Sequence, residues 1–399
     1  MRILELSPHY PPYPGGQEIY VRNLSEHLVS VGHRVTVLTT TLAESSSDQN
    51  GKVEVLREPS SITLLNNPLA WSVWRHRGLL EAVDIVHAHN EHSFMALNAA
   101  VLKYRVGRPL ALTLHGKLAF GNKALNAFER LYARTLGNAI LNRADAVFVD
   151  SSTRRDEVAA LGVPSERLTV VPNAVNVVAL DHCLSKEAYG DVRRDLGFQA
   201  NTKIVLFVGR LIPRKGITTL LLAFTRCVAR RDDVFLVIVG DGPLRSVCVR
   251  FQQSQRTRGR ITLLRWLEEA DLYRLYQAAD LFVLPSISEG CPTVLIEAMF
   301  FGCRVIASDI AGIRDHFAGS STLVPPEDIS LLADAIMDRL DEDSGGDTAK
   351  TKARETVTGT RFAPSPPRPS RQQAEPRKVN ARNTGAGTQT VSYNQPQDF

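Results

Sequence analysis

Two cationic residues follow one strongly apolar run in the second half of the 399-residue chain. The run at residues 204–209 is Ile-Val-Leu-Phe-Val-Gly, and it leads to Arg210 and Lys215, after which an amphipathic pattern begins at Ile217. A helix that starts there would add the positive end of its dipole to the two side-chain charges. This combination favours a diphosphate site. The alternative is a pair of solvated surface cations, which is the commoner fate of isolated basic residues.

A second segment places two carboxylates around a predicted helix start. Gly290 permits a tight turn and Pro292 suits the first turn of a helix, so Glu289 is expected on the preceding loop. Glu297 is expected inside the helix. Carboxylates so placed can accept hydrogen bonds from two different sets of sugar hydroxyls. The backbone N–H groups around Cys291–Val294 can meanwhile face an anion.

Two other patterns have more ordinary explanations. His87, His89 and His92 have the spacing His-x-His-x-x-His, but no ligand set of acids or cysteines accompanies them, and His87 ends a predicted strand. We therefore expect structural histidines and no metal site. The segment Gly240-Asp241-Gly242 suggests a dinucleotide site, but the third glycine of that fingerprint is missing.

The elements that must position these residues alternate along the chain. Continuous apolar runs predict strands that are buried on both faces, as in helix-covered parallel sheets. Amphipathic segments at residues 17–31, 217–230 and 271–279 predict helices between them. We expect an α/β fold with two Rossmann-like domains, at residues 1–180 and 200–340, whose parallel sheets face a central cleft. The apolar runs occupy residues 2–6, 34–40, 84–88, 110–115, 147–150, 168–172, 204–209, 234–240, 281–286 and 304–308.

The last part of the chain has a different composition. Residues 343–399 are rich in proline and polar residues and have no apolar periodicity, so we predict a disordered tail. Residues 348–399 hold nine lysines and arginines against three acids, although the whole chain has a net charge of only +5. The folded part is therefore nearly neutral, which argues against a nucleic-acid partner.

The sequence also bears on the cellular compartment. Its five cysteines include no Cys-x-x-Cys pair, and neither a signal peptide nor a membrane-spanning run is recognisable. We expect a cytoplasmic protein with reduced thiols. The basic tail allows peripheral contact with an anionic membrane on its inner face. Trp71 and Trp74 can act as an interfacial anchor, but core packing is the commoner role of such a pair.

Residues 1–340 resemble the retaining nucleotide-sugar glycosyltransferases of family 4, a large group with the GT-B fold. The signature of that family is two glutamates separated by seven residues, which correspond to Glu289 and Glu297. The resemblance extends over short motifs in both halves, namely Gly209-Arg210-Leu211, Lys215-Gly216, Gly240-Asp241-Gly242-Pro243, Gln277-Ala278-Ala279-Asp280, Ala311-Gly312, Pro14-Gly15-Gly16, Gly32-His33-Arg34-Val35, His87-Ala88-His89, Thr113-Leu114-His115-Gly116 and Pro172-Asn173-Ala174-Val175.

The resemblance implies roles for individual residues. In that family the first glutamate, here Glu289, contacts hydroxyls of the donor sugar, and the second, here Glu297, binds the ribose. The two cations neutralise the departing diphosphate, and a glycine pair closes over the donor. A histidine, here His115, lies near the reacting carbon, so that His115 and Glu289 are the catalytic candidates. The implied donor-binding residues are Gly15, Gly16, Arg210, Lys215, Glu289, Gly290, Cys291, Pro292, Thr293 and Glu297.

The resemblance also implies a reaction. A hexosyl residue would pass from a nucleoside-diphosphate sugar to a glycan or lipid-linked acceptor, with retention, in cell-surface polysaccharide or glycoconjugate synthesis. We expect neither a metal ion nor a cofactor, because two cations and a helix N-terminus stabilise the leaving diphosphate.

Four features depart from the family pattern. Asn176 replaces an aspartate, Asp315 a glutamate and Cys291 an aromatic residue. After Leu340 the sequence lacks the aromatic-rich helix that braces the N-terminal domain in that family. Two other functions therefore stay open. One is a degenerate, non-catalytic homologue that binds nucleotide. The other is a Rossmann-type, nicotinamide-dependent oxidoreductase, for which the glycine fingerprint is missing.

Overall fold

The computed structural model describes residues 1–13, 15–41, 53–60, 62–64, 67–70, 74–116, 123–175, 177–184, 192–199, 201–257 and 259–342. The predicted tail at 343–399 lies outside the described residues, as do Trp71 and Asn176. Within the described ranges, none of the helices has the length and the apolar content needed to span a bilayer.

The first half of the chain forms a seven-stranded sheet in the order β3-β2-β1-β6-β7-β8-β9. Every neighbouring pair is parallel. All four residues of β7 are buried, as expected for a strand that is covered on both faces. The strands are β1 (Arg2–Leu6), β2 (Arg34–Thr41), β3 (Glu54–Pro59), β6 (Ile85–His89), β7 (Leu110–Thr113), β8 (Ala146–Val149) and β9 (Leu168–Val170), with a separate antiparallel pair β4 (Thr63–Leu64) and β5 (Asn67–Pro68).

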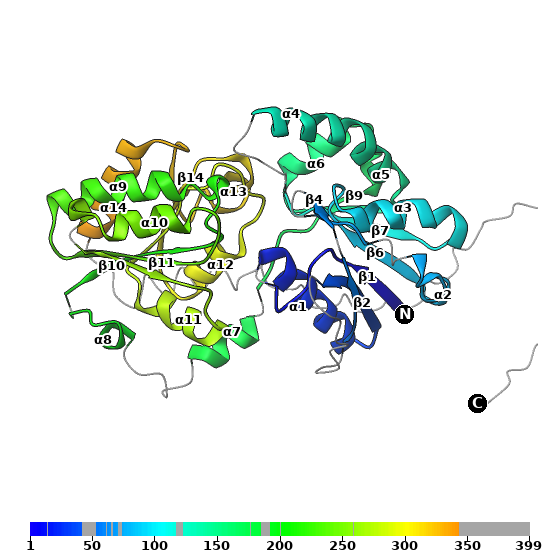
Figure 1. The fold of residues 1–399 in the computed structure, drawn as a ribbon, viewed down its shortest axis with the longest axis horizontal. Helices are drawn as coiled ribbons and strands as arrows, with labels where there is room; N and C mark the ends of the chain where they lie inside the picture. The colour runs from blue at the N-terminus through cyan, green and yellow to red at the C-terminus, as the bar shows by residue number, and fades with distance from the viewer. Residues whose placement is uncertain are drawn as a thin grey trace, which may run out of the picture. The chain divides into compact units, whose positions relative to one another are not determined.

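Helices cover both faces of this first sheet (Figure 1). Side chains alternate along β1, so Ile3 packs with Val21 of α1 on one face, whereas Leu4 packs with Met95 of α3 on the other. Glu5 therefore lies on the same face as Ile3, towards α1. The helices of this half are α1 (Gly16–Ser30), α2 (Arg77–Ala82), α3 (Phe94–Val106), α4 (Lys123–Tyr132), α5 (Asn138–Arg143) and α6 (Ser152–Ala159), with a π-helical turn at Ala133–Gly137 and a 3₁₀ turn at Ser165–Arg167. The next helix, α7 (Val177–Leu184), packs in the core of the second half.

The second half forms a six-stranded parallel sheet in the order β12-β11-β10-β13-β14-β15. Figure 1 shows α9, α10 and α14 on one side of this sheet and α11 on the other. Its strands are β10 (Lys203–Val208), β11 (Val234–Val239), β12 (Ile261–Leu264), β13 (Leu281–Leu284), β14 (Arg304–Ser308) and β15 (Thr322–Val324). Its helices are α8 (Val192–Asp195), α9 (Ile217–Arg230), α10 (Arg245–Gln252), α11 (Glu269–Ala278), α12 (Thr293–Phe300), α13 (Ala311–Phe317) and α14 (Ile329–Asp341), with 3₁₀ turns at Pro213–Lys215 and Gln255–Thr257.

Each sheet has a point at which the strand order reverses. In the first sheet β1 lies between β2 and β6, and in the second β10 lies between β11 and β13. Loops that leave the carboxyl ends of two such strands diverge to opposite faces and open a crevice for a ligand. The loops after β1, β10 and β13 are therefore the places where a binding site is expected.

The expected α/β class with two parallel sheets is confirmed, and each of the ten predicted strands overlaps an observed one. The sheet strands β3, β12 and β15 and the short pair β4 and β5 were not predicted. The first three lie at the edge of a sheet. Glu54 and Arg57 interrupt the apolar pattern of β3, and β12 and β15 are only four and three residues long. The domain limits at residues 180 and 200 stay a prediction. Val175 and Leu180, just before the first limit, pack in the core of the second half.

Candidate active site

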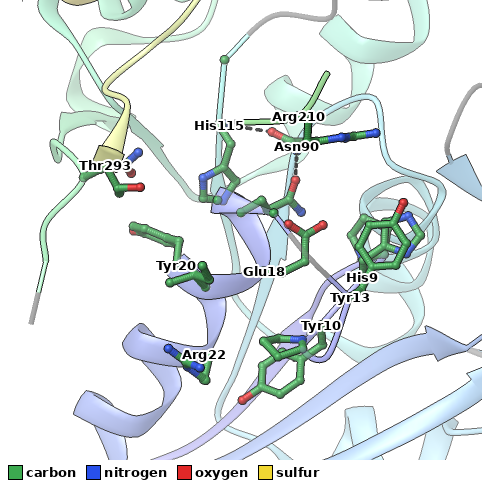
Figure 2. Close-up of a pocket in the computed structure, with 18 of the residues that line it drawn as sticks. His9, Tyr10, Tyr13, Glu18, Tyr20, Arg22, Asn90, His115, Arg210 and Thr293 are labelled. Carbon is green, nitrogen blue, oxygen red and sulfur yellow. Dashed lines mark hydrogen bonds between the residues drawn. The ribbon is translucent and has the colours of Figure 1, made fainter. Parts of the chain in front are cut away.

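The loops after β1, β10 and β13 line one cavity of about 1480 Å³. Figure 2 shows part of it, with Glu18 and Tyr20 of α1 near His115 and Arg210. Every residue that the sequence suggested for donor binding or catalysis lines this cavity: Gly15, Gly16, His115, Arg210, Lys215, Glu289, Gly290, Cys291, Pro292, Thr293 and Glu297. Their common location is an observation, whereas their individual roles remain predictions.

Lys215 and Glu289 form a largely buried ion pair, with 2.6 Å between Nζ and Oε1. Burial lowers the pKa of Lys215, and the charge of Glu289 opposes that shift. Burial by itself would raise the pKa of Glu289, but Lys215 and Arg214 more than offset it, so that this pKa is lowered. Each partner's charge thus favours the charged form of the other. The sequence did not predict that the expected phosphate cation would bond directly to the expected sugar-binding carboxylate.

The turn that carries Lys215 depends on Gly216. Its φ of +67° lies in the left-handed region, and an added Cβ would come 1.8 Å from the carbonyl oxygen of Pro285. Only glycine permits this close approach of the turn to the end of β13. Arg214 in the same turn lines the cavity, and its Nη1 donates to the carbonyl of Ser288 at 3.4 Å. Sequence analysis missed Arg214, although it lies between Arg210 and Lys215, the two cations that it selected.

Gly240 and Gly242 lie on a second loop, which packs beside the segment from Gly209 to Lys215. An added Cβ at Gly240 would come 2.0 Å from the carbonyl oxygen of Gly209, and one at Gly242 would come 2.7 Å from that of Leu211. The Leu211 N–H donates to the carbonyl of Asp241 at 2.9 Å. These glycines therefore let the loop after β11 pack against the loop that carries Arg210.

The start of α12 faces the cavity beside Glu289. Pro292 has an extended conformation and immediately precedes Thr293, the first residue of the helix. Backbone N–H groups in this first turn have no partner within the helix. Gly290 has no room for a side chain, because an added Cβ would come 1.5 Å from Oδ2 of Asp150. The side chain of Cys291 is buried. This wall can therefore bind an anion directly through its backbone.

Glu297 lies deeper on α12 and, among the described contacts, accepts one hydrogen bond from a side chain. The hydroxyl of Tyr276 on α11 donates to its Oε2 at 3.0 Å. Burial raises the pKa of Glu297 from 4.5 to about 7, and Tyr276 only partly opposes this shift. A carboxyl group in this state is poised to accept hydrogen bonds from ligand hydroxyls. Sequence analysis missed Tyr276, although it directly precedes the motif Gln277-Ala278-Ala279-Asp280.

On the opposite wall, Gly15 and Gly16 lead into α1. The φ of Gly15 is 165°, an extended value that any residue adopts. The restriction at Gly15 is one of space, because an added Cβ would come 2.1 Å from Oε2 of Glu18. Glu18 is buried in the cavity wall, and burial raises its pKa against the effect of Arg210. Sequence analysis missed Glu18, which lies three residues after the first glycine.

His115 follows β7 and is held on several sides. Its backbone N–H donates to Oδ1 of Asn90 at 2.8 Å, as Figure 2 shows. Its ring lies 4.7 Å from that of Tyr20, in an edge-on arrangement. Its Nε2 lies 3.0 Å from Nδ1 of His89. Burial, reinforced by the neighbouring histidines, lowers the pKa of His115 well below its usual value. The ring is therefore neutral near pH 7.

The expectation that no acid accompanies the three histidines was wrong. Glu5 of β1 lies between His87 and His89, with 3.0 Å from its Oε2 to Nδ1 of His87 and 2.9 Å to Nε2 of His89. The acid comes from the adjacent strand, far away in the sequence. The ligand atoms of these three residues lie within 4.8 Å of one another, as in a metal site. Direct hydrogen bonds join the carboxylate to both rings, however, and His92 is not part of the group.

Two hydrogen bonds join the two halves of the chain, and the first of them lies at the cavity. The amide of Asn173 donates to the carbonyl of Cys291 at 2.6 Å, and the Thr153 N–H donates to Oδ2 of Asp315 at 3.0 Å. Two of the departures from the family pattern, Cys291 and Asp315, thus connect the two halves. Trp74 packs against the core of the first half, as expected, and its indole N–H donates to Oδ1 of Asn98 at 3.1 Å.

Two family models match the chain. Residues 14–178 match the model described as Glycosyltransferase Family 4, and residues 190–356 match the model described as Glycosyl transferases group 1. The first match ends, and the second begins, between β9 and β10.

Individual proteins are similar over most of the chain. The phosphatidyl-myo-inositol mannosyltransferase of Mycolicibacterium smegmatis is 28% identical over 352 residues, which cover 86% of this chain and 86% of that protein. A solved structure of sucrose-phosphate synthase from Thermosynechococcus elongatus has a TM-score of 0.72 and 25% identity, and the match covers 90% of this chain and 95% of that one. The structure of HepE from Anabaena in complex with UDP-glucose has a TM-score of 0.72 and 21% identity, with 91% and 96% covered.

Proposed function

Because the chain belongs to the family 4 glycosyltransferases and has their GT-B fold, we propose that it transfers a hexosyl residue from a nucleoside-diphosphate sugar to a glycan or lipid-linked acceptor. Transfer proceeds with retention at the anomeric carbon and without a metal ion. The UDP-glucose in the HepE structure supports the donor class, and the lipid-directed mannosyltransferase among the relatives supports the acceptor class. The family matches favour this function over an oxidoreductase.

The observation that carries the proposal is the cationic end of the cavity. Arg210, Arg214 and Lys215 line it together with the first turn of α12. When the bond between the anomeric carbon and the diphosphate breaks, negative charge develops on the leaving oxygen and positive charge on the sugar. Preorganised cations and backbone N–H groups in a site shielded from water stabilise the leaving group.

The ion pair between Lys215 and Glu289 orients both partners for this step. An ammonium group has three donors, and one of them is engaged by Oε1 of Glu289. The other two are available for phosphate oxygens. Oε2 of Glu289 can accept a hydrogen bond from a hydroxyl of the donor sugar. Glu297, about one turn into α12, is then placed to accept hydrogen bonds from the ribose.

The other wall of the cavity is left for the acceptor. His9 and Tyr13 line it as a stacked pair, with ring centroids 4.1 Å apart. Flat aromatic faces of this kind suit the apolar face of a sugar ring. We therefore assign the acceptor to the side of the cavity formed by the loop after β1. Synthesis of a cell-surface polysaccharide or glycoconjugate at the inner face of a membrane is part of the same proposal.

A donor screen tests the function. Thermal shift with UDP, GDP and ADP, and with their hexose conjugates, identifies the base, and hydrolysis of the selected donor in EDTA tests metal independence. Nucleotide binding without hydrolysis or transfer would favour the non-catalytic homologue. The coupling constant of the anomeric proton in the new linkage decides the stereochemistry, and inversion would contradict the proposal.

Two glutamate variants test the assignment of roles. Glu297→Gln is expected to weaken binding of the bare nucleotide, because a ribose acceptor is lost. Glu289→Gln is expected to impair sugar transfer and to leave binding of the bare nucleotide unchanged. Titration calorimetry with the nucleotide and a transfer assay separate the two effects. Normal nucleotide binding by both variants would mean that the assignment is wrong.

A further inference from the structure

A row of buried residues leads from the core of the first sheet to the cavity. Glu5 on β1 and His89 on β6 have no solvent exposure, and the two strands are neighbours. His115 follows β7, the next strand of the sheet, and lines the cavity. A fully buried carboxylate without a lysine or arginine partner is costly to a fold. Its two hydrogen-bonded histidines are the partners that keep it charged.

The hydrogen bonds in this row have a fixed direction. Burial by itself would raise the pKa of Glu5, but His87 and His89 lower it to about 2, so the carboxylate is ionised. An ionised carboxylate only accepts hydrogen bonds. The proton in the hydrogen bond between Glu5 and His89 therefore belongs to Nε2 of His89. Burial lowers the pKa of His89, which keeps its ring neutral. Its Nδ1 then carries a lone pair and accepts the proton of His115 Nε2 at 3.0 Å.

We propose that Glu5, acting through His89, fixes the tautomer of His115 with the proton on Nε2, so that Nδ1 accepts a hydrogen bond from a hydroxyl of the donor sugar. The inference rests on the proposed function and deepens it. Glu5 and His89 are positioning residues, and His115 is the group that touches the substrate. In this tautomer His115 cannot protonate the leaving diphosphate through Nδ1. The hydrogen bond to Asn90 and the packing against Tyr20 keep this part of the chain in place.

Imidazole nitrogen shifts test the tautomer without any substrate. The full chain, labelled with ¹⁵N-histidine, contains ten histidines, and His115→Gln identifies the signals of His115. We expect a protonated Nε2 and an unprotonated Nδ1 from pH 6 to pH 8. A proton on Nδ1 of His115 in the wild-type protein would overturn the inference. So would a stoichiometric metal ion bound by His89, because the Nε2 of that residue would then carry no proton.

Two variants separate positioning from general support of the fold. Glu5→Leu removes the acceptor of His89, so we expect His115 to show the other tautomer or a mixture of both. His87→Gln is the matched control, because the glutamine amide can still donate a hydrogen bond to Glu5, and position 87 has no hydrogen bond to His115 among the described contacts. It is expected to leave the His115 signals in place. A shift of the His115 tautomer in His87→Gln that equals the shift in Glu5→Leu would contradict the assignment to Glu5.

Kinetics give a second readout. For hydrolysis of UDP-glucose, or of the donor found in the screen, Glu5→Leu is expected to lower kcat by about 10- to 100-fold, by analogy with the loss of a partner that orients a metal-ligating histidine. Affinity for the bare nucleoside diphosphate is expected to stay within about twofold, since His115 contacts only the sugar in this mechanism. If Glu5→Leu lowered kcat and the affinity for the nucleoside diphosphate by the same factor, Glu5 would have only a structural role. If the wild-type chain hydrolyses none of the donors, the proposed function fails, and the nitrogen shifts still decide the tautomer.

Discussion

Glu5 is fully buried and Glu297 is partly buried, both close to the same cavity, yet their pKa values move in opposite directions. Glu5 lies between two histidines on the N-terminal side, and its pKa falls to about 2. Glu297 lies on the C-terminal side with the hydroxyl of Tyr276 as its partner, and its pKa rises to about 7. Burial acts in the same sense on both. The difference teaches that the partners, and not the depth of burial, decide which buried carboxylate is charged.

The difference also corresponds to two functions. A carboxylate that is permanently ionised can hold the proton arrangement of its neighbours, as Glu5 does for His89. A carboxyl group that lacks a cationic partner, as Glu297 does among the described contacts, keeps its hydrogen-bonding capacity for a ligand. The first kind of site stabilises a geometry, and the second remains available for binding.

The largest expected effect is a pH-dependent loss of stability caused by Glu297. Its pKa is 4.5 in the unfolded chain and about 7 in the folded one. As the pH rises from 4 to 8, the unfolded state releases the proton first, so the free energy of unfolding falls by about 3 kcal/mol. Glu297→Gln has no such proton. Urea unfolding of both proteins at several pH values should show the difference growing with pH, and parallel curves would contradict it.

Glu5 should change the stability in the opposite direction: it stabilises the fold more as the pH rises from acidic values. Its pKa is lowered from 4.5 to about 2 in the folded chain, so its stabilising contribution is complete above pH 4.5 and is lost as the pH falls through 2. Relative to Glu5→Gln, the wild-type protein should lose about 3 kcal/mol between pH 5 and pH 2. Urea unfolding measures it. If the contribution of Glu5 to the free energy of unfolding fell with rising pH, as that of Glu297 does, the contrast between the two residues would be wrong.

A smaller effect is expected from Lys215. Its charge pairs with Glu289 and, in the proposed function, also contacts the diphosphate of the ligand. Lys215→Ala removes a charge-assisted contact to the diphosphate and should weaken nucleoside diphosphate binding by about 1.5–3 kcal/mol. Calorimetry at a fixed salt concentration checks it. Arg226→Ala is the control, since Arg226 is an exposed cation on α9 that does not line the cavity. Unchanged affinity in Lys215→Ala would refute the phosphate role.

The smallest effect concerns the partner of Glu297. Tyr276→Phe removes the hydroxyl that donates to Oε2 at 3.0 Å. That hydrogen bond lowers the pKa of Glu297 against the effect of burial. Its loss should raise the pKa further and steepen the pH dependence of stability by about 0.5–1.5 kcal/mol. The same unfolding series measures the change. A lower pKa for Glu297 in Tyr276→Phe would show that hydrogen-bond partners do not set the pKa difference between Glu297 and Glu5.

The sequence alone determined the features that are contiguous in the chain. Apolar runs such as residues 204–209 identified the central strands, because a strand buried on both faces needs such a run. The basic turn before α9 and the segment at the start of α12 each combine loop, helix start and charged side chains within about a dozen residues. Such motifs keep their geometry wherever the fold places them.

Only the tertiary structure decided what depends on neighbouring strands and opposing walls. Glu5, His89 and His115 come from β1, β6 and the end of β7, and no spacing in the sequence indicates that they touch. The pairing of Lys215 with Glu289 likewise joins the ends of β10 and β13. Sheet order determines these contacts, and parallel strands that are neighbours in space need not be neighbours in the chain. The protonation of each buried group follows from those contacts, so it could be derived only once the fold was known.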